Sequence, residues 1–323
     1  MDVIRLDGYL YIPDFNTIIN TETEDIFLKN IHNRDKVKIY DLSIDKETIK
    51  REFKKIKQIT FETTQDCNLS CKYCVYSNSY KNTRNITKKK LEFKTAKKAL
   101  DLIFSLIKYR KKKRIAIGFY GGEPMLNFDN VRRIVEYAQI SFTDFEIIFS
   151  MTTNGTLLKK EDIDFLKKHN FRLLVSLDGP EDVHNAKRVY RSGEGTFEKI
   201  IKNLKKVKRT YPNYYERYIS FSVVWSRDLL FEKIYNFFIN NELVNNSGIR
   251  LSPVSESDTD YYQDYHYDVT RAKLETDKIF KVIINKIENQ DKLAPIDYSI
   301  LRDPLNYLIP RKSFTSLFGA CFL

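Results

Sequence analysis

The sequence predicts an α/β protein whose core is a parallel sheet of six strands, preceded by a small α+β segment. Six short runs of apolar and β-branched residues recur near 58–64, 115–120, 146–152, 171–177, 218–225 and 249–253. Helical patterns separate them, near 91–110, 128–141, 160–169, 196–210 and 228–241. Strands that alternate with helices of this length indicate βαβ units and a parallel sheet. A chain of 323 residues that is 42% hydrophobic can fill a core of that size.

The N-terminal region, 1–54, differs in its sequence pattern from the rest of the chain. Two alternating runs, 8–12 and 16–20, flank a Pro-Asp turn and predict a small hairpin. The stretch 21–32 then reads as a helix, because a threonine is followed three residues later by a glutamate, as in a capping box. Residues 55–255 are expected to form the core domain.

Three of the four cysteines, Cys67, Cys71 and Cys74, follow the first predicted strand in a C-x3-C-x2-C spacing. A loop this compact can direct three thiolates at one centre. A structural zinc site takes four ligands and no histidine lies nearby, so zinc would need a further ligand from elsewhere in the chain. An iron–sulfur cube also takes four thiolates, and three leave one iron open for a small molecule. The spacing favours the cluster and leaves a zinc knuckle as the alternative.

With Tyr73 before Cys74, the motif C-x3-C-x-aromatic-C resembles that of the radical S-adenosylmethionine (radical SAM) superfamily. The resemblance implies that the three cysteines hold three irons of a [4Fe-4S] cluster and that SAM chelates the fourth. It also implies reductive cleavage of SAM to a 5'-deoxyadenosyl radical, which abstracts a hydrogen atom from the substrate. The fold implied is a partial (β/α)6 barrel similar to a TIM barrel, in which ligands bind at the carboxyl ends of the strands.

The second predicted strand leads to Gly121, Gly122, Glu123 and Pro124, a run similar to the family's GGE motif. Glycines let backbone approach a ligand closely, and a carboxylate beside them can accept from an ammonium group. The resemblance implies that this run binds the amino group of SAM. After the third strand, Asn154 lies in a run similar to the family's TNG motif, whose side chains lie near the ribose and the substrate. Each run taken alone is also typical of an ordinary turn.

The fourth predicted strand ends in a run that resembles the S-[LI]-D-G-P…H-x3-R pattern of peptide and sulfatase maturases. By that resemblance Ser176 contacts the ribose region of SAM, and Asp178 belongs to the same cofactor site. Either Arg188 or Arg191 binds the SAM carboxylate, since a guanidinium suits bidentate recognition of a carboxylate. His184 is interpreted as a packing residue at a helix start.

The last region, 256–323, is expected to be helical and irregular. The tyrosine-rich stretch 255–268 is interpreted either as a loop that contacts substrate over the barrel mouth or as a solvated connector. A long amphipathic helix is predicted over 270–290 and an irregular stretch over 293–317. The final residues resemble the opening of the SPASM extension, a domain with auxiliary clusters. Cys321 is then a candidate auxiliary-cluster ligand in a chain that ends at the start of that domain.

The net charge is +12, from 55 Lys and Arg against 43 Asp and Glu. A basic surface can serve an anionic partner, but the sequence has no arginine-rich arm and no nucleic-acid motif, so a nucleic acid is not the expected partner. It contains no run of 18 apolar residues and no pattern typical of a secretion signal. The cysteine pattern differs from a disulfide framework. A reducing, cytoplasmic setting is therefore expected.

The motifs together favour a radical SAM enzyme similar to the maturases of ribosomally made peptides (RiPPs). The expected reaction abstracts hydrogen from a residue of a precursor peptide and leads to a thioether or carbon–carbon cross-link. The expected partners are that peptide and an electron donor of the flavodoxin or ferredoxin type. The N-terminal region resembles the leader-binding segment of such enzymes, which uses strand addition, although a structural cap fits equally. Alternatives are a sulfatase maturase that forms formylglycine, a catalytically silent peptide-binding barrel and a zinc-dependent nucleic-acid-binding protein.

Overall fold

The computed structural model describes residues 4–6, 9–12, 17–20, 26–28, 46–256 and 258–308, with side chains for 47, 51–256 and 258–302. The chain divides into two compact units, Met1–Glu52 with Leu301–Leu323, and Phe53–Ile300. Cys321 lies outside the described residues. Within the part of the chain that is described, no helix is both long enough and apolar enough to cross a membrane.

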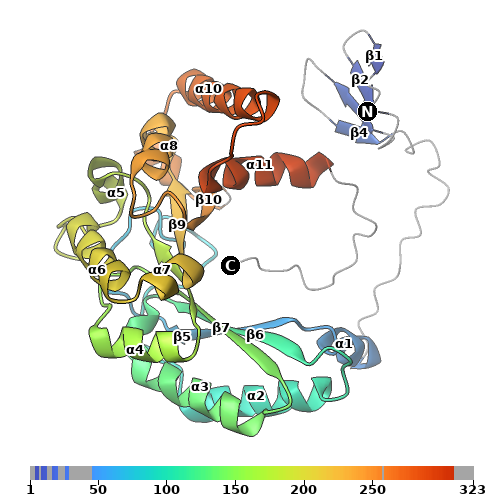
Figure 1. Cartoon of the computed structure of the whole chain (residues 1–323), viewed down its shortest axis with the longest axis vertical. Helices are drawn as coiled ribbons and strands as arrows, with labels where there is room; N and C mark the ends of the chain where they lie inside the picture. The colour runs from blue at the N-terminus through green and yellow to red at the C-terminus, as the bar shows by residue number, and fades with distance from the viewer. Residues whose placement is uncertain are drawn as a thin grey trace. The chain divides into compact units, whose positions relative to one another are not determined.

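The first unit contains an antiparallel sheet whose four strands follow one another in chain order (Figure 1). They are β1 (Ile4–Leu6), β2 (Tyr9–Ile12), β3 (Thr17–Asn20) and β4 (Ile26–Leu28). The predicted hairpin is confirmed, since Tyr9 faces Asn20 across β2 and β3. The helix α1 (Lys46–Phe53) follows the sheet in the chain.

The predicted helix over 21–32 is wrong at β4, which pairs with β3 instead. The Ile-Phe-Leu run of β4 has a high β propensity, and pairing with a neighbouring strand outweighs a local capping pattern. The remainder of that predicted helix lies outside the described residues.

The second unit is built on a parallel sheet with the strand order β10-β9-β8-β7-β6-β5. The strands are β5 (Gln58–Thr64), β6 (Arg114–Gly121), β7 (Glu146–Thr153), β8 (Arg172–Ser176), β9 (Ile219–Trp225) and β10 (Gly248–Pro253). All six predicted strands are confirmed. Each strand pairs beside the preceding one, so that β5 and β10 form the two edges of a sheet that curves into a partial barrel (Figure 1).

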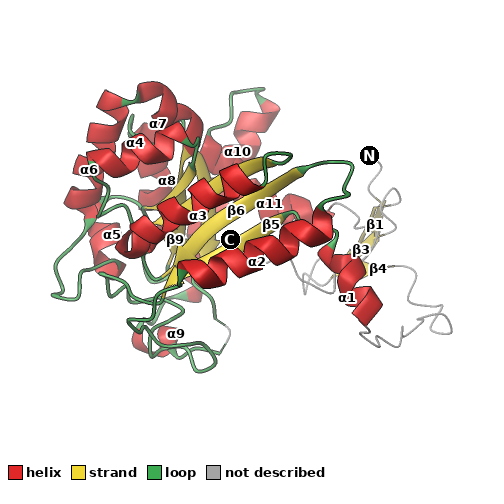
Figure 2. Ribbon diagram, turned by 90° about the horizontal axis from the view of Figure 1, so that it is seen from below, coloured by secondary structure: helices red, strands yellow, loops and turns green. Residues whose placement is uncertain are grey.

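Helices cover the outer face of this curved sheet (Figures 1 and 2). The predicted ones appear as α2 (Phe93–Ile107), α3 (Phe128–Ser141), α4 (Lys160–Lys168), α6 (Phe197–Thr210) and α8 (Phe231–Asn240). Aromatic rings fill the layer between sheet and helices. Phe171 stacks against Phe119 and Phe149, with ring centroids 5.8 and 5.4 Å apart, and lies 6.5 Å from Phe165 of α4.

Further helices lie in the connections between these elements. The sequence interpretation lacked η4 (Pro124–Asn127), α7 (Pro212–Tyr218) and α9 (Tyr261–Asp264). For α5 (Glu181–Lys187) it gave only a helix start at His184. The long helix predicted over 270–290 is confirmed as α10 (Val269–Glu288).

The prediction of an irregular stretch over 293–317 is wrong for α11 (Pro295–Leu308). The fully buried Asp297 accepts from the amide of Ala294 at 2.8 Å and thereby caps the first turn. It also accepts from the hydroxyl of Tyr235 in α8 and the ammonium of Lys286 in α10, at 2.8 and 2.9 Å. Because two of these three partners come from other elements, much of what stabilises the helix lies outside its local sequence pattern.

Candidate active site

The three cysteines lie in the loop that leaves the carboxyl end of β5, and backbone hydrogen bonds hold that loop in place. The amides of Ser70 and Lys72 donate to the carbonyls of Val189 and Lys187, at 2.8 and 2.9 Å. Between the cysteines, Leu69 is buried at 2% exposure and anchors the loop in the core. The end of α5 and the stretch that follows it therefore hold the loop between Cys67 and Cys74.

The three thiols are half-buried, and Cys71 and Cys74 lie close enough for their charges to act on Cys67. Burial is the main cause that raises the pKa of Cys67 to about 12. The amide of Leu69 opposes this rise, and the charges of Glu123, Cys71 and Cys74 contribute to it. Burial likewise raises the pKa of Cys71 to about 11, although the guanidinium of Arg188 opposes this. Thiolates gathered in such a site need positive charge to compensate for lost water, and bound metal supplies it.

The spacing of these ligands bears on which metal group fits. In the described residues, no three His, Cys, Asp or Glu side chains are gathered around one point as the ligands of a single ion are. A cube binds each cysteine at a different iron, so that its ligand sulfurs lie farther apart than those around one zinc ion. The C-x3-C-x2-C loop offers three thiols to such a cube, one for each of three irons.

The two glycines at the end of β6 make a close backbone contact with the start of the cysteine loop. The amides of Gly122 and Glu123 donate to the carbonyls of Thr64 and Asp66, each at 2.8 Å. A Cβ added at Gly122 would overlap the carbonyl oxygen of Asp66, and Gly121 has a φ of +138° that favours glycine. The glycines thus join the ends of β5 and β6 at the base of the cysteine loop.

Glu123 links the ends of β6 and β7. Its carboxylate is 1% exposed and accepts from the hydroxyl of Thr153 and the amide of Asn154, each at 2.7 Å. It also accepts from the amide of Met125 at 3.1 Å and so caps η4, which begins at Pro124. Burial raises the pKa of this carboxyl, while the three donors counteract that effect.

Asn154 connects the end of β7 to the cysteine loop through Asn68, which the sequence analysis missed. The side-chain amide of Asn154 donates through Nδ2 to the side-chain oxygen of Asn68 at 2.9 Å, and the same Nδ2 lies 4.0 Å from the sulfur of Cys67. Asn68 in turn donates to Thr156 at 2.9 Å. The position of Asn68 between two of the cysteines was the signal available in the sequence.

Asp178, just beyond β8, collects donors from three separate segments. One carboxylate oxygen accepts from the hydroxyl of Tyr73 and from Nε of Arg188, the latter at 2.9 Å. The other oxygen accepts from the amide of Val224 in β9 at 2.9 Å. Arg188 also lies 3.7 Å from the sulfur of Cys71 through Nη1. The aromatic residue of the cysteine motif is thereby joined to the aspartate and arginine of the downstream motif.

The structure places the two candidate arginines differently. Arg188 is 8% exposed and lies beside Cys71, whereas the Arg191 side chain is about half exposed and pairs with Asp66 at 2.5 Å. Ser176 is 7% exposed at the end of β8, where it pairs with Ser222 of β9. The predicted residues from Cys67 to Arg188 therefore gather at the carboxyl ends of β5 to β8, and Arg191 lies at their periphery.

His184 is fully buried and supports the segments that carry Asp178 and Arg188. Its Nδ1 accepts from the amide of Asp178 at 3.2 Å, which leaves Nε2 to face the hydroxyl of Thr196 at 2.9 Å. The Thr196 hydroxyl donates to the carbonyl of Arg188 at 3.1 Å. This chain of contacts agrees with the interpretation of His184 as a packing residue.

We expect His184 to make the chain less stable in mild acid. Burial lowers the pKa of His184 to about 4, from an ordinary 6.5. Between these values the unfolded chain binds a proton that the folded chain excludes, so stability is retained above pH 6.5 and lost as the pH falls toward 4. At pH 5.5 the loss is about 1 kcal/mol. Urea unfolding of iron-free protein at pH 7.5 and 5.5 measures it.

The exposed His266 offers the matched control for this measurement. A His184→Asn variant is expected to lose this part of the pH dependence, and His266→Asn to keep it. An unchanged pH dependence in His184→Asn would contradict the assignment.

The tyrosine-rich stretch 255–268 packs against the cysteine loop. Tyr261 is fully buried and forms an apolar cluster with Tyr73 and Val254, against which Cys71 is packed. Lys187, whose side chain is 3% exposed, pairs with Asp228 at 2.7 Å and lies over a ring of this stretch. The tyrosine rings of the stretch thus pack against the site. Its other side chains are largely exposed, as a solvated connector predicts: Ser255, Glu256, Asp258, Gln263, Asp264, His266 and Asp268.

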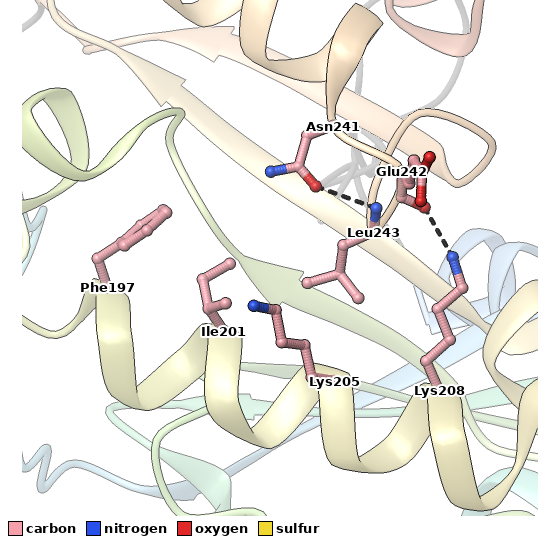
Figure 3. Close-up of a pocket in the computed structure, with 7 residues that line it drawn as sticks. All are labelled: Phe197, Ile201, Lys205, Lys208, Asn241, Glu242 and Leu243. Atoms are coloured by element: carbon pink, nitrogen blue, oxygen red, sulfur yellow. Dashed lines mark hydrogen bonds between the residues drawn. The ribbon is translucent and has the colours of Figure 1, made fainter.

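A separate hollow of about 600 Å³ lies between α6 and the turn after α8 (Figure 3). Its lining residues are Phe197, Ile201, Lys205, Lys208, Asn241, Glu242 and Leu243. The Lys208 ammonium donates to the carbonyl of Glu242 at 2.6 Å across its rim. None of these residues belongs to the cysteine site.

Comparison with known proteins places this geometry in context. A family model described as the radical SAM superfamily matches residues 61–224. The radical SAM cyclopropyl synthase TigE of Paramaledivibacter caminithermalis is 28% identical over 278 residues, which are 83% of this chain and 56% of that protein. A cysteine-type anaerobic sulfatase-maturating enzyme of Clostridium novyi is 30% identical over 193 residues, 57% of this chain and 48% of that enzyme.

Among solved structures, native anSMEcpe with bound AdoMet resembles this fold with a TM-score of 0.57 at 19% identity. The match covers 73% of this chain and 63% of that one. The chain spans about half the length of the curated relatives it matches.

Proposed function

Because the chain belongs to the radical SAM superfamily, we propose that it modifies a residue of a ribosomally made precursor peptide by hydrogen-atom abstraction. The superfamily uses a [4Fe-4S] cluster and SAM, which together supply a 5'-deoxyadenosyl radical when bound. One observation supports the proposal most. The three thiols, Glu123 and the Asp178–Arg188 pair all lie at the carboxyl end of one parallel sheet, where α/β folds bind ligands.

In this proposal, Cys67, Cys71 and Cys74 hold the cluster. Glu123 and the backbone of Gly121 and Gly122 bind the amino group of SAM. The Glu123 carboxylate already accepts three hydrogen bonds, and a carboxylate offers about four lone-pair sites, which leaves room for an ammonium donor.

Arg188 is proposed to bind the SAM carboxylate in preference to Arg191, because it is buried beside Cys71. Asn154 and Ser176 are proposed for the ribose side, and Tyr73 and Asp178 to hold Arg188. The apolar cluster around Tyr73 borders Cys71 and is suited to keeping water from the site.

The relatives support a polypeptide substrate and the making of a carbon–carbon bond. The sulfatase-maturating enzyme acts on a protein by its name, and TigE, which matches most of this chain, is named for making a three-membered carbon ring. A carbon–carbon or thioether bond within a peptide is therefore the proposed product. The proposed setting is cytoplasmic, with a flavodoxin- or ferredoxin-type electron donor.

Anaerobic reconstitution tests the proposal. The protein is loaded with iron and sulfide, reduced with dithionite in the presence of SAM, and assayed for 5'-deoxyadenosine by mass spectrometry. We expect about four irons per chain and formation of 5'-deoxyadenosine. A loaded cluster without this product would support the silent barrel, and zinc at one per chain would support the zinc-dependent alternative.

Isotope transfer tests the substrate class. Deuterium from labelled, cysteine-containing precursor peptides is expected to appear in 5'-deoxyadenosine, together with loss of hydrogen from the peptide. The sulfatase-maturase alternative is favoured by the similarity to the Clostridium novyi enzyme. It predicts instead that a sulfatase peptide gains an aldehyde at its cysteine.

A further inference from the structure

We propose that Arg188 tunes the iron–sulfur cluster by donating a hydrogen bond to the sulfur of Cys71, and so raises the reduction potential of the cluster. The inference rests on the proposed function, because it requires a cluster on the three cysteines. It assigns Arg188 a role as a positioning and tuning residue that is separate from any contact with SAM.

The geometry that supports this role is direct. Nη1 of Arg188 lies 3.7 Å from the Cys71 sulfur, within the range of an N–H···S hydrogen bond. The sulfur is the atom that would bind iron. The arginine is 8% exposed and Cys71 packs against the apolar cluster of Tyr73, so little water competes for the contact.

Arg188 is held at three points, one through its guanidinium and two through its backbone. Nε donates to Asp178 at 2.9 Å, the carbonyl accepts from Thr196 at 3.1 Å and the amide donates to the carbonyl of His184 at 2.8 Å. The ring of Tyr73 lies 5.3 Å from the guanidinium carbon, and its hydroxyl donates to the same aspartate. Arg188 therefore reaches the sulfur from a fixed side chain rather than a mobile one.

The chemistry of arginine suits this double contact. Its planar guanidinium presents five N–H donors in a rigid fork, so one edge can bind a carboxylate while the other faces a sulfur. A lysine has a single ammonium centre and cannot keep both geometries. Arginine also stays charged in a buried site, which lysine does less readily.

The expected effect on the cluster follows from charge. Reduction adds negative charge, which a hydrogen bond and a positive group at a ligand sulfur stabilise. The carboxylate of Asp178 offsets part of the positive charge of Arg188. It binds at Nε, however, so the N–H group at Nη1 still faces the sulfur of Cys71. Removal of the guanidinium should make the cluster harder to reduce.

The test is a redox titration of the reconstituted protein, followed by electron paramagnetic resonance and performed without SAM. Leaving SAM out removes any contribution from a contact between Arg188 and that molecule. In Arg188→Met, the ratio of reduced to oxidised cluster at a fixed potential is expected to fall about tenfold, which for one electron is about 59 mV. Arg188→Lys keeps the positive charge but not the forked guanidinium. Its ratio of reduced to oxidised cluster should lie between those of the wild type and Arg188→Met.

Arg191→Met is the matched control. It removes the same charge from the same stretch of chain, but Arg191 is paired with Asp66 and about half exposed. Its cluster should titrate as the wild type does.

The possible results separate the inference from the proposed function. A loaded Arg188→Met cluster with the wild-type potential, or an equal shift in Arg191→Met, would overturn the tuning role and leave the proposed function intact. If both Arg188 variants lost iron while Arg191→Met kept its cluster, Arg188 would be needed to assemble the cluster, and the tuning role would be overturned. A wild-type protein that binds no cluster would instead end the proposed function.

Discussion

Substitution of Cys71 by alanine is expected to abolish formation of 5'-deoxyadenosine, with a decrease of more than about a hundredfold, because the chemistry belongs to the cluster. Two thiolates cannot hold three irons, and the variant also loses the sulfur that faces Arg188. The iron content should fall with the activity. Metal analysis and mass spectrometry of the anaerobically reconstituted protein measure both quantities.

Cys321→Ala is the matched control for that variant, since it removes a thiol that lies outside the C-x3-C-x2-C motif. It should keep its iron and its ability to cleave SAM. Circular dichroism of both variants checks that the fold persists. A Cys71→Ala protein with the full iron content and wild-type activity would contradict the assignment of the cluster ligands.

The sheet could be predicted from the sequence because its signal is local. Alternating apolar runs and helical patterns in turn specify βαβ units, and each unit places its strand next to the preceding one. The motifs could be located for the same reason, since each directly follows a strand. The failure at β4 arose because pairing with the neighbouring strand β3 outweighed a local capping pattern. The failure at α11 arose because packing with distant residues stabilises that helix.

Within the site, the sequence could name the residue types but not their partners. Arg188 and Arg191 lie three residues apart, and both remained candidates for the SAM carboxylate although only Arg188 fits the H-x3-R spacing. Burial and the contact with Cys71 now favour Arg188. Tyr73 was identified as the aromatic residue of the motif, whereas its bond to Asp178 spans more than a hundred residues of chain. Such contacts depend on the fold and leave no trace in the spacing of residues.

The backbone contact made by the glycines of the GGE motif also could not be predicted from the sequence. The sequence suggested that they allow a ligand to approach the backbone. The structure shows that Gly122 lies against the carbonyl of Asp66, one residue before Cys67. Whatever it does for a ligand, Gly122 is therefore also required for the backbone of the cysteine loop to meet the end of β6.

We therefore expect Gly122→Ala to be among the most damaging single substitutions in the chain. The new Cβ would overlap the Asp66 carbonyl, and because that atom is backbone, relief requires the cysteine loop to move away from β6. The cost is expected to be about 3 kcal/mol. The displaced loop should also lose iron, because Cys67 would move relative to Cys71 and Cys74. Urea unfolding and metal analysis measure the two effects.

Gly193→Ala provides the control, since no atom lies within 4 Å of a Cβ added there and the only strain comes from its φ of +92°. That variant should lose about 1 kcal/mol and keep its iron. If both glycine variants lost equal stability and kept their iron, the backbone contact at Gly122 would accommodate a Cβ. The glycine of the motif would then be required only for the approach of a ligand. If Gly122→Ala loses iron and Gly193→Ala does not, the approach of β6 to the cysteine loop is what holds the three thiols in their relative positions.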